Sequence, residues 1–402
     1  MKILQINSVC GVGSTGRIAA DLYKMAAGKG YHCKVAFGRG RAVGVPDKDA
    51  IRIGNDVDVK IHALMTRITD KTGFYSKGAT KRLIRKIKSF DPDVIHLHNL
   101  HGYYVNIELL FEYLSKANKR VVWTLHDCWA FTGHCAYFDF CGCEKWKIGC
   151  HECAQKTKYP ASILVDNSAS NFLKKKSLLN AVKDMTIITP SEWLADLVKE
   201  SFLQKHKVQV INNGIDLSIF KHTDSEFRNE YGLQDRFVIL GVANIWDERK
   251  GFDAFLRLAQ ELDEQFRIVI VGLNDKLKKE LPGNIIGISR TDSIAKLAEI
   301  YSAADVFVNP TLEDNFPMTN LEALACRTPV ITYDTGGSPE CVDETCGMVV
   351  QKNDVGALKD AVVSLRERQI APETCHERAK LYDKEKQYAE YLDLYQATNL
   401  EL

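Results

Sequence analysis

The chain has 402 residues, of which 45% are hydrophobic and 26% charged, and this composition excludes a small peptide, a single small domain and a disordered chain. The net charge is +1, but the first 215 residues carry 32 Lys and Arg against 19 Asp and Glu, and the remainder carries 21 against 33. This division suggests an anionic partner for the first half only, such as a phospholipid surface, a lipid diphosphate or nucleic acid. An unevenly solvated surface explains the same numbers.

The first residues, MKILQINSVC, lack the long apolar stretch of a secretory signal. No segment of the chain reaches the roughly 20 apolar residues that a membrane-spanning helix needs. We therefore expect a cytoplasmic protein, whose 12 cysteines stay reduced unless they bind metal.

Short runs rich in Val and Ile alternate with longer amphipathic stretches along the whole chain, as in strand–helix units around parallel sheets. Continuous apolar runs such as FVILGVA are typical of parallel strands that are buried on both faces. The strands expected in a first domain are 3–6, 34–37, 94–97, 121–125 and 186–188. Those expected in a second domain are 237–242, 268–271, 285–288, 306–309 and 330–332. The predicted fold class is α/β, with two doubly wound Rossmann-like sheets.

The segment INNGIDLSIF interrupts this alternation and predicts the joint between the domains. We expect an N-terminal domain over 1–215, a C-terminal domain over 216–380, and a helix within 381–402 that packs back on the first domain. Ligands of open parallel sheets bind beyond the carboxyl ends of the strands, so the two domains are expected to face each other across a ligand cleft.

Apolar residues recur at helical spacing between Gly78 and Phe90, whereas basic residues cover the rest of that surface. The apolar positions are Ala79, Leu83, Ile87 and Phe90, and the basic ones are Lys81, Arg82, Arg85, Lys86 and Lys88. Such a helix can lie on anionic lipid headgroups, although an ordinary solvated helix face has the same pattern.

A glycine-rich turn, CGVGSTG, follows the first predicted strand. Its glycines allow the backbone to approach a ligand, and Ser14 or Thr15 could cap the helix that follows. Backbone N–H groups at such a helix start suit a phosphate or a sugar hydroxyl, so Gly13 and Gly16 with the residues between them are candidates for donor binding. A turn that only packs a helix against the sheet would use the same glycines.

The stretch NPTLEDNFPMTNLEALA follows the predicted strand 306–309. Pro317 is well placed as the first helical residue, Asp314 and Asn315 come just before the helix, and Glu322 lies along it. The positive helix end then lies between two carboxylates. A nucleoside diphosphate sugar matches this layout, with its diphosphate at the helix end, its ribose at Glu322 and its sugar at Asp314.

This stretch resembles the signature of retaining glycosyltransferases of family 4, in which a carboxylate and a glutamate are separated by seven residues. The family carries Glu-Gly-Phe where this chain has Asp314-Asn315-Phe316, and Glu313 is the neighbouring candidate. The segments INNGID and ERKG also resemble the linker and the Lys-Gly phosphate loop of the family. The resemblance implies the GT-B architecture of two Rossmann-like domains.

The resemblance further implies that Lys250 contacts the donor diphosphate. The family carries Gly-Arg six residues earlier, where this chain has Ala243-Asn244, so Arg249 could replace that cation or Asn244 could donate a neutral hydrogen bond. The implied donor loop after the last predicted strand contains Gly336, Gly337 and Glu340. With the glycine-rich turn, the full set of candidate donor residues is Gly13, Ser14, Thr15, Gly16, Asn244, Arg249, Lys250, Asn315, Phe316, Pro317, Glu322, Gly336 and Gly337.

His126-Asp127 resembles the acceptor-side histidine position of the family, with a purely structural histidine as the alternative. For His96, His98 and His101 a structural role is favoured. The implied mechanism retains the anomeric configuration without a metal or an identified protein nucleophile, so alignment and leaving-group stabilisation carry the catalysis. The implied catalytic residues are His126, Asp127, Lys250, Asp314 and Glu322.

A cysteine-rich insertion occupies 133–154. Cys150 and Cys153 have the spacing that turns two thiolates onto one metal ion, and two upstream cysteines could complete a tetrahedral site. We expect Cys135, Cys143, Cys150 and Cys153 to hold a structural zinc ion, with Cys141 or His151 as substitutes. Family 4 enzymes of surface-polysaccharide assembly look similar in this stretch.

The sequence thus predicts a retaining hexosyltransferase that uses a UDP or GDP sugar and needs no catalytic metal. The expected acceptor is a lipid-linked glycan at the inner face of a bacterial membrane, in capsule or exopolysaccharide assembly, where the protein lies peripherally. One alternative is a nucleotide-sugar epimerase with the same paired sheets. The other is a zinc-containing nucleic-acid binder, which lacks an aromatic and basic reading surface here, so no nucleic acid is expected.

Overall fold

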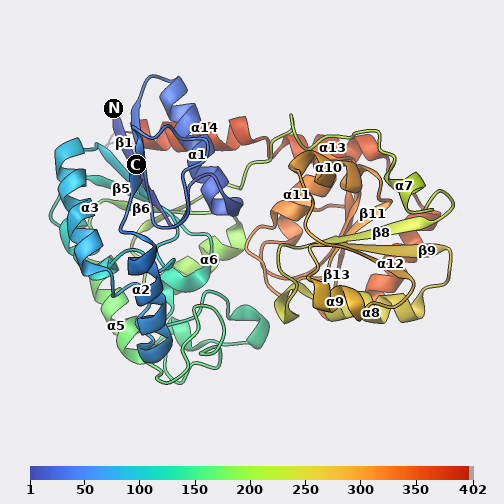
Figure 1. Ribbon diagram of the computed structural model, residues 1–402, viewed down its shortest axis with the longest axis horizontal. Coiled ribbons are helices and arrows are strands. Elements are labelled where there is room, and N and C mark those ends of the chain that lie inside the picture. Colours follow the sequence, from blue (N-terminus) through green and yellow to red (C-terminus); the bar gives the residue numbers. More distant parts are fainter. Residues whose placement is uncertain (398–402) are drawn as a thin grey trace. The chain divides into compact units, whose positions relative to one another are not determined.

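The computed structural model describes residues 1–397, which form two compact units (Figure 1). The first unit contains Met1–Ile211 and the chain from Tyr388 onward, and the second contains Asn212–Gln387. Each unit is a parallel sheet with helices on its faces, which confirms the predicted α/β class. The part of the predicted last segment at 398–402 lies outside the described residues.

The sheet of the first unit has seven parallel strands in the order β3-β2-β1-β4-β5-β6-β7. Its strands are β1 (Lys2–Asn7), β2 (His32–Phe37), β3 (Ala50–Arg52), β4 (Val94–Leu97), β5 (Arg120–Thr124), β6 (Met185–Thr189) and β7 (Lys207–Val210). Its helices are α1 (Gly13–Gly28), α2 (Asp56–Thr69), α3 (Lys77–Phe90), α4 (Ile107–Leu114), η1 (Cys128–Phe131), η2 (Asp139–Cys141), η3 (Lys145–Lys147), α5 (Ser168–Leu179) and α6 (Glu192–Glu200).

The sheet of the second unit has six parallel strands in the order β10-β9-β8-β11-β12-β13. Its strands are β8 (Phe237–Val242), β9 (Phe266–Val271), β10 (Ile285–Ile288), β11 (Val306–Asn309), β12 (Val330–Tyr333) and β13 (Gly347–Val350). Its helices are α7 (Phe227–Glu230), η4 (Glu248–Lys250), α8 (Phe252–Glu261), α9 (Asp275–Lys279), α10 (Ile294–Ser302), α11 (Met318–Ala325), η5 (Pro339–Cys341), α12 (Val355–Glu367) and α13 (Pro372–Lys380).

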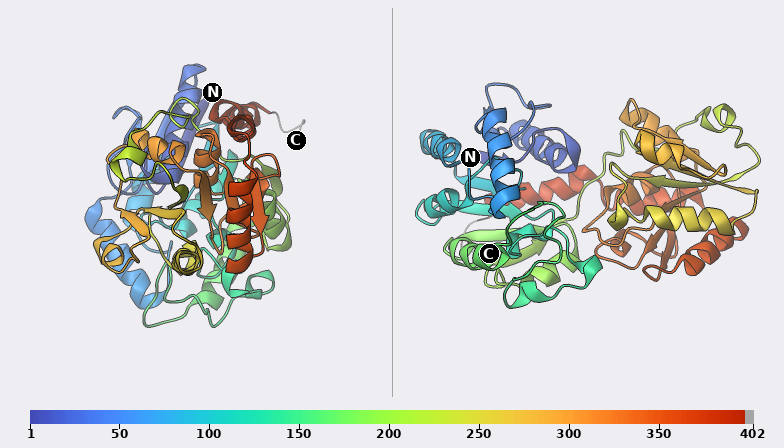
Figure 2. Two further views of the ribbon diagram at one scale, coloured as in Figure 1. Left: turned by 90° about the vertical axis from the view of Figure 1, so that its right-hand side faces the viewer. Right: turned by 60° about the horizontal axis from the view of Figure 1, so that its bottom comes forward.

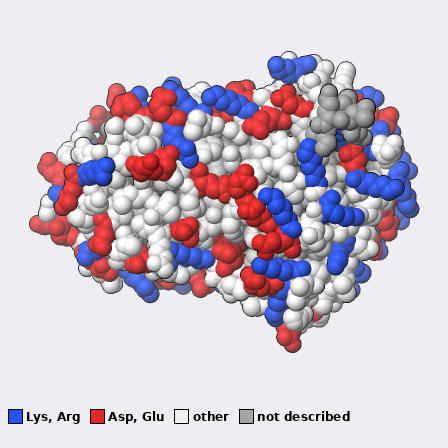
Figure 3. All heavy atoms as spheres, turned by 180° about the vertical axis from the view of Figure 1, so that it is seen from behind, with Lys and Arg blue, Asp and Glu red and all other residues white. Residues whose placement is uncertain are grey.

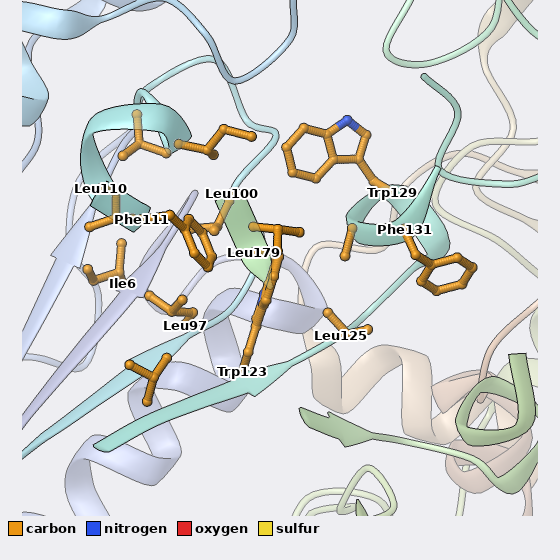
Figure 4. Packing of buried hydrophobic residues seen from close by; sticks show 14 of the residues in the cluster. Ile6, Leu97, Leu100, Leu110, Phe111, Trp123, Leu125, Trp129, Phe131 and Leu179 are labelled. Carbon is orange, nitrogen blue, oxygen red and sulfur yellow. The ribbon is translucent and has the colours of Figure 1, made fainter. Parts of the chain in front are cut away.

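A continuous apolar core fixes the middle of the first sheet (Figure 4). Ile6, Leu97 and Trp123 come from the neighbouring strands β1, β4 and β5, and all three are buried. The ring of Phe111 on α4 packs against Trp123 with centroids 5.4 Å apart. This packing holds the carboxyl ends of the three strands side by side, which is where the first unit places its glycine-rich turn and its histidines.

Helix α14 (Lys384–Gln396) completes the first unit (Figures 1 and 2). The Tyr395 hydroxyl lies 2.6 Å from His96 Nδ1, and Thr124 Oγ1 donates to the Tyr391 hydroxyl at 3.1 Å. Tyr391 and Tyr395 are both buried among residues of β1, β4 and β5. The chain therefore passes between the two units twice, once at Ile211 and once before Tyr388.

Three strands have no counterpart among the predicted ones, namely β3, β7 and β13. All three lie at the edge of a sheet. Among the residues that the structure describes, no helix is both long enough and apolar enough to cross a bilayer.

Candidate functional site

Each sheet has a switch point beside its first strand. In the second unit, β9 and β11 lie on opposite sides of β8, and in the first unit β2 and β4 lie on opposite sides of β1. Open α/β sheets bind ligands at such points, in the crevice beyond the carboxyl ends of the strands. The loops after β8 and β11 are therefore the candidate site of the second unit.

These two loops are joined by an ion pair. Lys250 lies on the loop after β8, and its Nζ donates to Asp314 Oδ2, on the loop after β11, at 2.5 Å. The two side chains are only 22% and 19% exposed. Burial by itself would raise the pKa of Asp314, but the charges of Lys250 and Arg249 hold it below its usual value. The site thus holds an ionised carboxylate beside an ammonium group that has further N–H donors to offer.

Backbone contacts connect this pair to a third loop, after β12. The Leu312 N–H donates to the Arg249 carbonyl at 2.7 Å, and the Gly337 N–H donates to the Asp314 carbonyl at 3.0 Å. Gly336 has a φ of +59°, and a Cβ there would lie 2.0 Å from the Asp314 carbonyl oxygen. A side chain would therefore displace the Asp314 loop, so glycine is required where these loops meet.

Arg249 and Glu313 have roles that the sequence left open. Arg249 Nη1 donates to the backbone carbonyl of Glu313 at 2.8 Å, so its guanidinium lies across the loop that carries Asp314. The Glu313 side chain is completely buried. The carboxylate that faces Lys250 is thus that of Asp314.

The residues after Asp314 anchor this loop in the core of the second unit. Asn315 and Phe316 are 4% and 3% exposed, and the Phe316 ring packs on Tyr382 with centroids 5.5 Å apart. Pro317 is the residue before the first helical residue, Met318, so its predicted place inside the helix is wrong by one position. The reason is its extended backbone, with a ψ of 118°. No side chain caps this end of α11.

Glu322 lies on α11 and is 5% exposed. The hydroxyl of Tyr301, from α10, donates to Glu322 Oε2 at 3.0 Å. The sequence analysis missed Tyr301, because nothing in the local pattern of α10 distinguishes a tyrosine that packs in the core from one that orients a carboxylate.

A buried polar network holds α11 and the loop after β12, and it was also missed. Asn309 Nδ2 donates to Asn320 Oδ1 at 2.8 Å, and Asn320 Nδ2 donates to the Ser338 carbonyl at 3.1 Å. The Ser338 and Thr332 hydroxyls lie 2.6 Å apart. The available signal was an asparagine at the end of an apolar strand and another within an apolar helix, since buried amides need partners.

In the first unit, the glycine-rich turn leads directly into α1, whose N-cap is Val12. No side chain caps this helix, so the expectation that Ser14 or Thr15 would do so is wrong. Both residues lie inside the first turn because the helix begins at Gly13, and Asn7 Nδ2 instead donates to Thr15 Oγ1 at 3.4 Å. The turn is closed by the Gly11 N–H, which donates to the Gly16 carbonyl at 2.8 Å.

A chain of hydrogen bonds leads from β1 to His126. Gln5 Nε2 donates to the Ala19 carbonyl at 2.9 Å, so Gln5 Oε1 is turned toward His98 Nε2, 3.0 Å away. His98 therefore carries its proton on Nε2, and its Nδ1 accepts from His126 Nε2 at 3.2 Å. Burial lowers the pKa of His126 to about 4 and that of His98 well below its usual value, so both rings are neutral near pH 7.

Both carboxylate oxygens of Asp127 accept hydrogen bonds that hold the loop after β5. Its Oδ2 accepts from His101 Nε2 at 2.7 Å, and its Oδ1 accepts from the Trp129 N–H at 3.0 Å. The Tyr159 hydroxyl lies 3.0 Å from His101 Nδ1. Asp127 and His101 thus fix the loop after β5, and the side chain in position to meet a ligand is that of His126, which is partly exposed.

The four cysteines of the predicted zinc site line one cavity of about 20 Å³. Three of the four sulfurs make hydrogen bonds: Cys150 Sγ accepts from the Gly133 N–H at 3.2 Å, and Cys135 and Cys153 hydrogen-bond to each other. Within residues 1–397, no group of three or more His, Cys, Asp or Glu side chains is arranged to hold a metal ion. The expectation of a structural zinc ion at Cys135, Cys143, Cys150 and Cys153 is therefore not supported.

Packing of aromatic rings holds the insertion in this structure. The rings of Phe138 and Trp146 lie 5.0 Å apart, and those of Phe131 and Trp146 lie 5.4 Å apart. The buried Lys175 donates to the carbonyl groups of Trp129 and Thr132 at 2.7 and 3.1 Å. The Phe131–Trp146 contact attaches the insertion to η1, and Lys175 attaches α5 to the same 3-10 helix, directly after the loop of His126.

Comparison with known proteins gives matches along almost the whole chain. WcaC of Escherichia coli (strain K12), which is named as a colanic acid biosynthesis glycosyl transferase, is 26% identical over 98% of this chain and 100% of its own. A D-inositol 3-phosphate glycosyltransferase of Corynebacterium jeikeium (strain K411) is 28% identical over 45% of this chain and 49% of its own.

Two solved structures show the same fold. Sucrose-phosphate synthase from Thermosynechococcus elongatus aligns with a TM-score of 0.73 at 18% identity, over 98% of both chains. Anabaena Alr3699/HepE in complex with UDP-glucose aligns with a TM-score of 0.65 at 15% identity, over 98% of this chain and 100% of its own.

The family description "Glycosyltransferase Family 4" matches residues 15–219, and the description "Glycosyl transferases group 1" matches residues 236–368. The first match alone covers more than half of the chain. With its two parallel-sheet units, the chain belongs to glycosyltransferase family 4 and has the GT-B fold.

Proposed function

We propose that this glycosyltransferase moves a sugar from a UDP or GDP sugar to a lipid-linked glycan, with retention of the anomeric configuration, during assembly of a bacterial surface polysaccharide. The similarity to WcaC over the full length of both chains supports the pathway, and the UDP-glucose bound to Alr3699/HepE supports the donor class. The observation that carries the proposal is the Lys250–Asp314 pair at the switch point of the second sheet.

In this proposal the donor diphosphate lies at the uncapped start of α11 and contacts Lys250 and Arg249. Asp314 accepts from hydroxyl groups of the transferred sugar, and Glu322, oriented by Tyr301, accepts from the ribose. The loop residues Asn244, Asn315, Phe316, Pro317, Gly336 and Gly337 complete the part of the donor site that the second unit supplies.

The chemistry requires stabilisation of the charge that develops on the departing diphosphate. Lys250 supplies a cation whose position is fixed before the reaction by Asp314, and such preorganised charge is the largest catalytic contribution in many enzymes. The departing diphosphate assists removal of the acceptor proton on the same face of the sugar. Neutral His126, whose proton on Nε2 points to His98, accepts one hydrogen bond through Nδ1 at the acceptor side without changing its charge near pH 7.

The first unit is proposed to meet the acceptor at the inner face of the membrane. Figure 3 shows Lys and Arg side chains spread over this unit on the face seen from behind. Helix α3 has no acidic residue, and its buried residues are Ala79, Thr80, Leu83 and Ile87, so its basic side chains face outward. This charge favours a phosphorylated lipid-linked acceptor and an anionic membrane surface.

We expect UDP-glucose or another UDP or GDP sugar to raise the melting temperature of the purified chain. A ligand at 100 times its Kd stabilises the folded state by about 2.7 kcal/mol, which shifts the melting temperature of a chain of this size by several degrees. Asp314→Asn should reduce this shift. No shift and no calorimetric heat with any common nucleotide sugar would refute the proposal, and an isomerised donor in the absence of acceptor would indicate an epimerase.

We expect Gln5→Leu to lower kcat by about tenfold with little change in the KM for the donor, because His98 then loses the acceptor that sets its tautomer, and with it that of His126. Gln209→Leu, on the edge strand β7, is the matched control and should leave kcat unchanged. Nitrogen-15 NMR of the imidazole rings should place the proton of wild-type His126 on Nε2. A proton on Nδ1 would contradict the assigned chain of hydrogen bonds.

A further inference from the structure

Helix α2 exposes four apolar residues, although Val59 packs against the core, and the two buried residues of the helix are polar. The residues buried in this helix are His62 and Thr66. The exposed stripe, which we call the α2 stripe, consists of Val57 (62% exposed), Ile61 (54%), Leu64 (58%) and Ile68 (38%). Their spacing of four, three and four residues places them on one face of the helix. Surface helices of globular proteins normally have the opposite polarity, with the apolar face toward the core.

Polar contacts hold α2 in this orientation. His62 Nε2 accepts from the Gly73 N–H at 3.1 Å, and His62 Nδ1 lies 2.8 Å from Ser76 Oγ. At the start of the helix, Asn55 and Asp58 form a reciprocal capping box. A rotation that buried the stripe would break these contacts and expose the buried imidazole, so the apolar face is a stable feature of the surface.

A second exposed apolar segment continues the stripe at the C-terminal end of α2. Ile163, Leu164 and Val165 are 67%, 68% and 42% exposed. The Ile163 N–H donates to the Arg67 carbonyl at 2.7 Å, which places this segment at the last turn of the helix. Helix α2 lies at the surface of the first unit in Figure 1 and in the right-hand view of Figure 2. The two segments together form one apolar patch.

Cations border this patch. Lys60 and Arg67 are exposed on one flank of the stripe, and Arg82 of the neighbouring helix α3 lies 3.6 Å from Asp58. The two acids of α2 are both paired internally, Asp58 with Arg82 and Asp56 with Arg52 at 2.6 Å. The exposed basic residues of α3 are Lys77, Lys81, Arg82, Arg85, Lys86 and Lys88. An apolar stripe with a cationic border is characteristic of helices that lie in the interface of an anionic bilayer.

A second copy of the chain fits this patch less well than a bilayer does. A twofold contact through the α2 stripe would bring the basic residues of α3 of both copies toward each other without a compensating acidic surface. An anionic bilayer offers acyl chains to the apolar residues and negative headgroups to the cations beside them. The charge of the border thus selects the lipid surface as the occupant.

We propose that the α2 stripe, together with 163–165, inserts into the boundary between headgroups and acyl chains of an anionic phospholipid bilayer. The first unit is then held on the membrane by apolar contact in addition to the attraction of its charges. The inference rests on the proposed function for the location of the acceptor, and it adds the element of the fold that makes the contact.

The test is flotation of the full chain with vesicles of phosphatidylcholine alone or mixed with phosphatidylglycerol. Wild-type protein should float with the mixed vesicles, and part of this binding should persist at about 1 M salt, where the Debye length is about 3 Å. Ile61→Ser and Leu64→Ser should each weaken binding on the order of tenfold, and the double variant should lose the salt-resistant part. The matched control is Leu381→Ser, at an apolar residue 55% exposed in the second unit, which should bind as wild type does.

The possible outcomes distinguish insertion into a bilayer from self-association of the chain. Equal binding by the wild type and the double variant, or no binding by the wild type, would overturn the inference. A concentration-dependent dimer that the double variant abolishes, without vesicle binding, would overturn it in favour of self-association. Calorimetry with UDP and GDP sugars on the same preparations tests the proposed function separately, because the α2 stripe contains no donor-binding residue. Unchanged melting temperatures would show that the exposed substitutions leave the fold intact.

Discussion

Lys250→Ala is expected to lower kcat/KM for the donor by a factor of about 100 to 1,000. The substitution removes the cation that the Asp314 carboxylate holds 2.5 Å away and leaves that carboxylate without its ion-pair partner at the donor site. Losing one preorganised group that stabilises developing charge costs about 100-fold to 1,000-fold in other enzymes. The measurement is the initial rate of sugar transfer at several donor concentrations.

Two further variants separate this role from a general effect of charge. Arg249→Ala should lower kcat/KM less than Lys250→Ala does. Arg249 Nη1 donates to the backbone carbonyl of Glu313, whereas Lys250 donates directly to the Asp314 carboxylate. Lys279→Ala, in the last turn of α9, removes an equal charge from the second unit and should leave the rate unchanged. Wild-type rates for Lys250→Ala would remove the phosphate-binding role from this residue.

Acidification from pH 7 to pH 5 is expected to unfold the first unit before the second. Burial lowers the pKa of His62 and His96 to about 3 and of His126 and His206 to about 4, and it also lowers that of His98. The unfolded chain binds protons at these histidines below about pH 6.5, but the folded chain does not until near pH 4. Unfolding free energy therefore falls with pH across this window, by on the order of 1 kcal/mol per histidine for each pH unit.

The loss in the first unit should approach the total stability of a domain, which is about 5–15 kcal/mol. One histidine opposes it: although burial favours the neutral ring of His134, its hydrogen bond to Asp70 raises its pKa overall, so that histidine stabilises the fold at low pH. The two histidines of the second unit, His222 and His376, are not buried.

Tryptophan fluorescence can follow this difference, because four of the five tryptophans, Trp123, Trp129, Trp146 and Trp193, lie in the first unit. Thermal melts at pH 7 and pH 5 should show a larger decrease for this signal than for far-ultraviolet circular dichroism, which reports both units. His206→Gln should reduce the decrease, and His151→Gln, at an exposed position, should not. Equal decreases by both signals would contradict the prediction.

The central strands were predictable, whereas three of the four edge strands, β3, β7 and β13, were not. The fourth edge strand, β10, was predicted from its apolar run IIGI. Central strands of a parallel sheet are covered on both faces, so β8 reads as the apolar run FVILGV. Edge strands are only partly covered: in β7, with the sequence KVQV, no residue is fully buried. Their sequences therefore resemble those of loops, although they pair in register with the neighbouring strand.

The residues of the candidate site also differ in how far a local sequence pattern could predict them. Lys250 and Asp314 could be named as candidates because each lies in a short local motif that resembles one of the family, in the loop that follows a strand. The chain of contacts from Gln5 through His98 to His126 was not predicted, because it forms only after three strands have come together and no local pattern records it. The cysteines show the converse, since their spacing indicated proximity but could not indicate whether the four sulfurs converge on one point.

The route of the chain has a consequence for biosynthesis. The second unit is inserted within the first, whose final helix is α14. A ribosome releases that helix only after the whole inserted unit has been made, so the first unit cannot complete its core during translation until then. Until α14 docks, the nascent sheet lacks the tyrosines that cover His96 and Thr124. During this interval the exposed core is open to chaperone binding, and a chain that ends prematurely would never bury it.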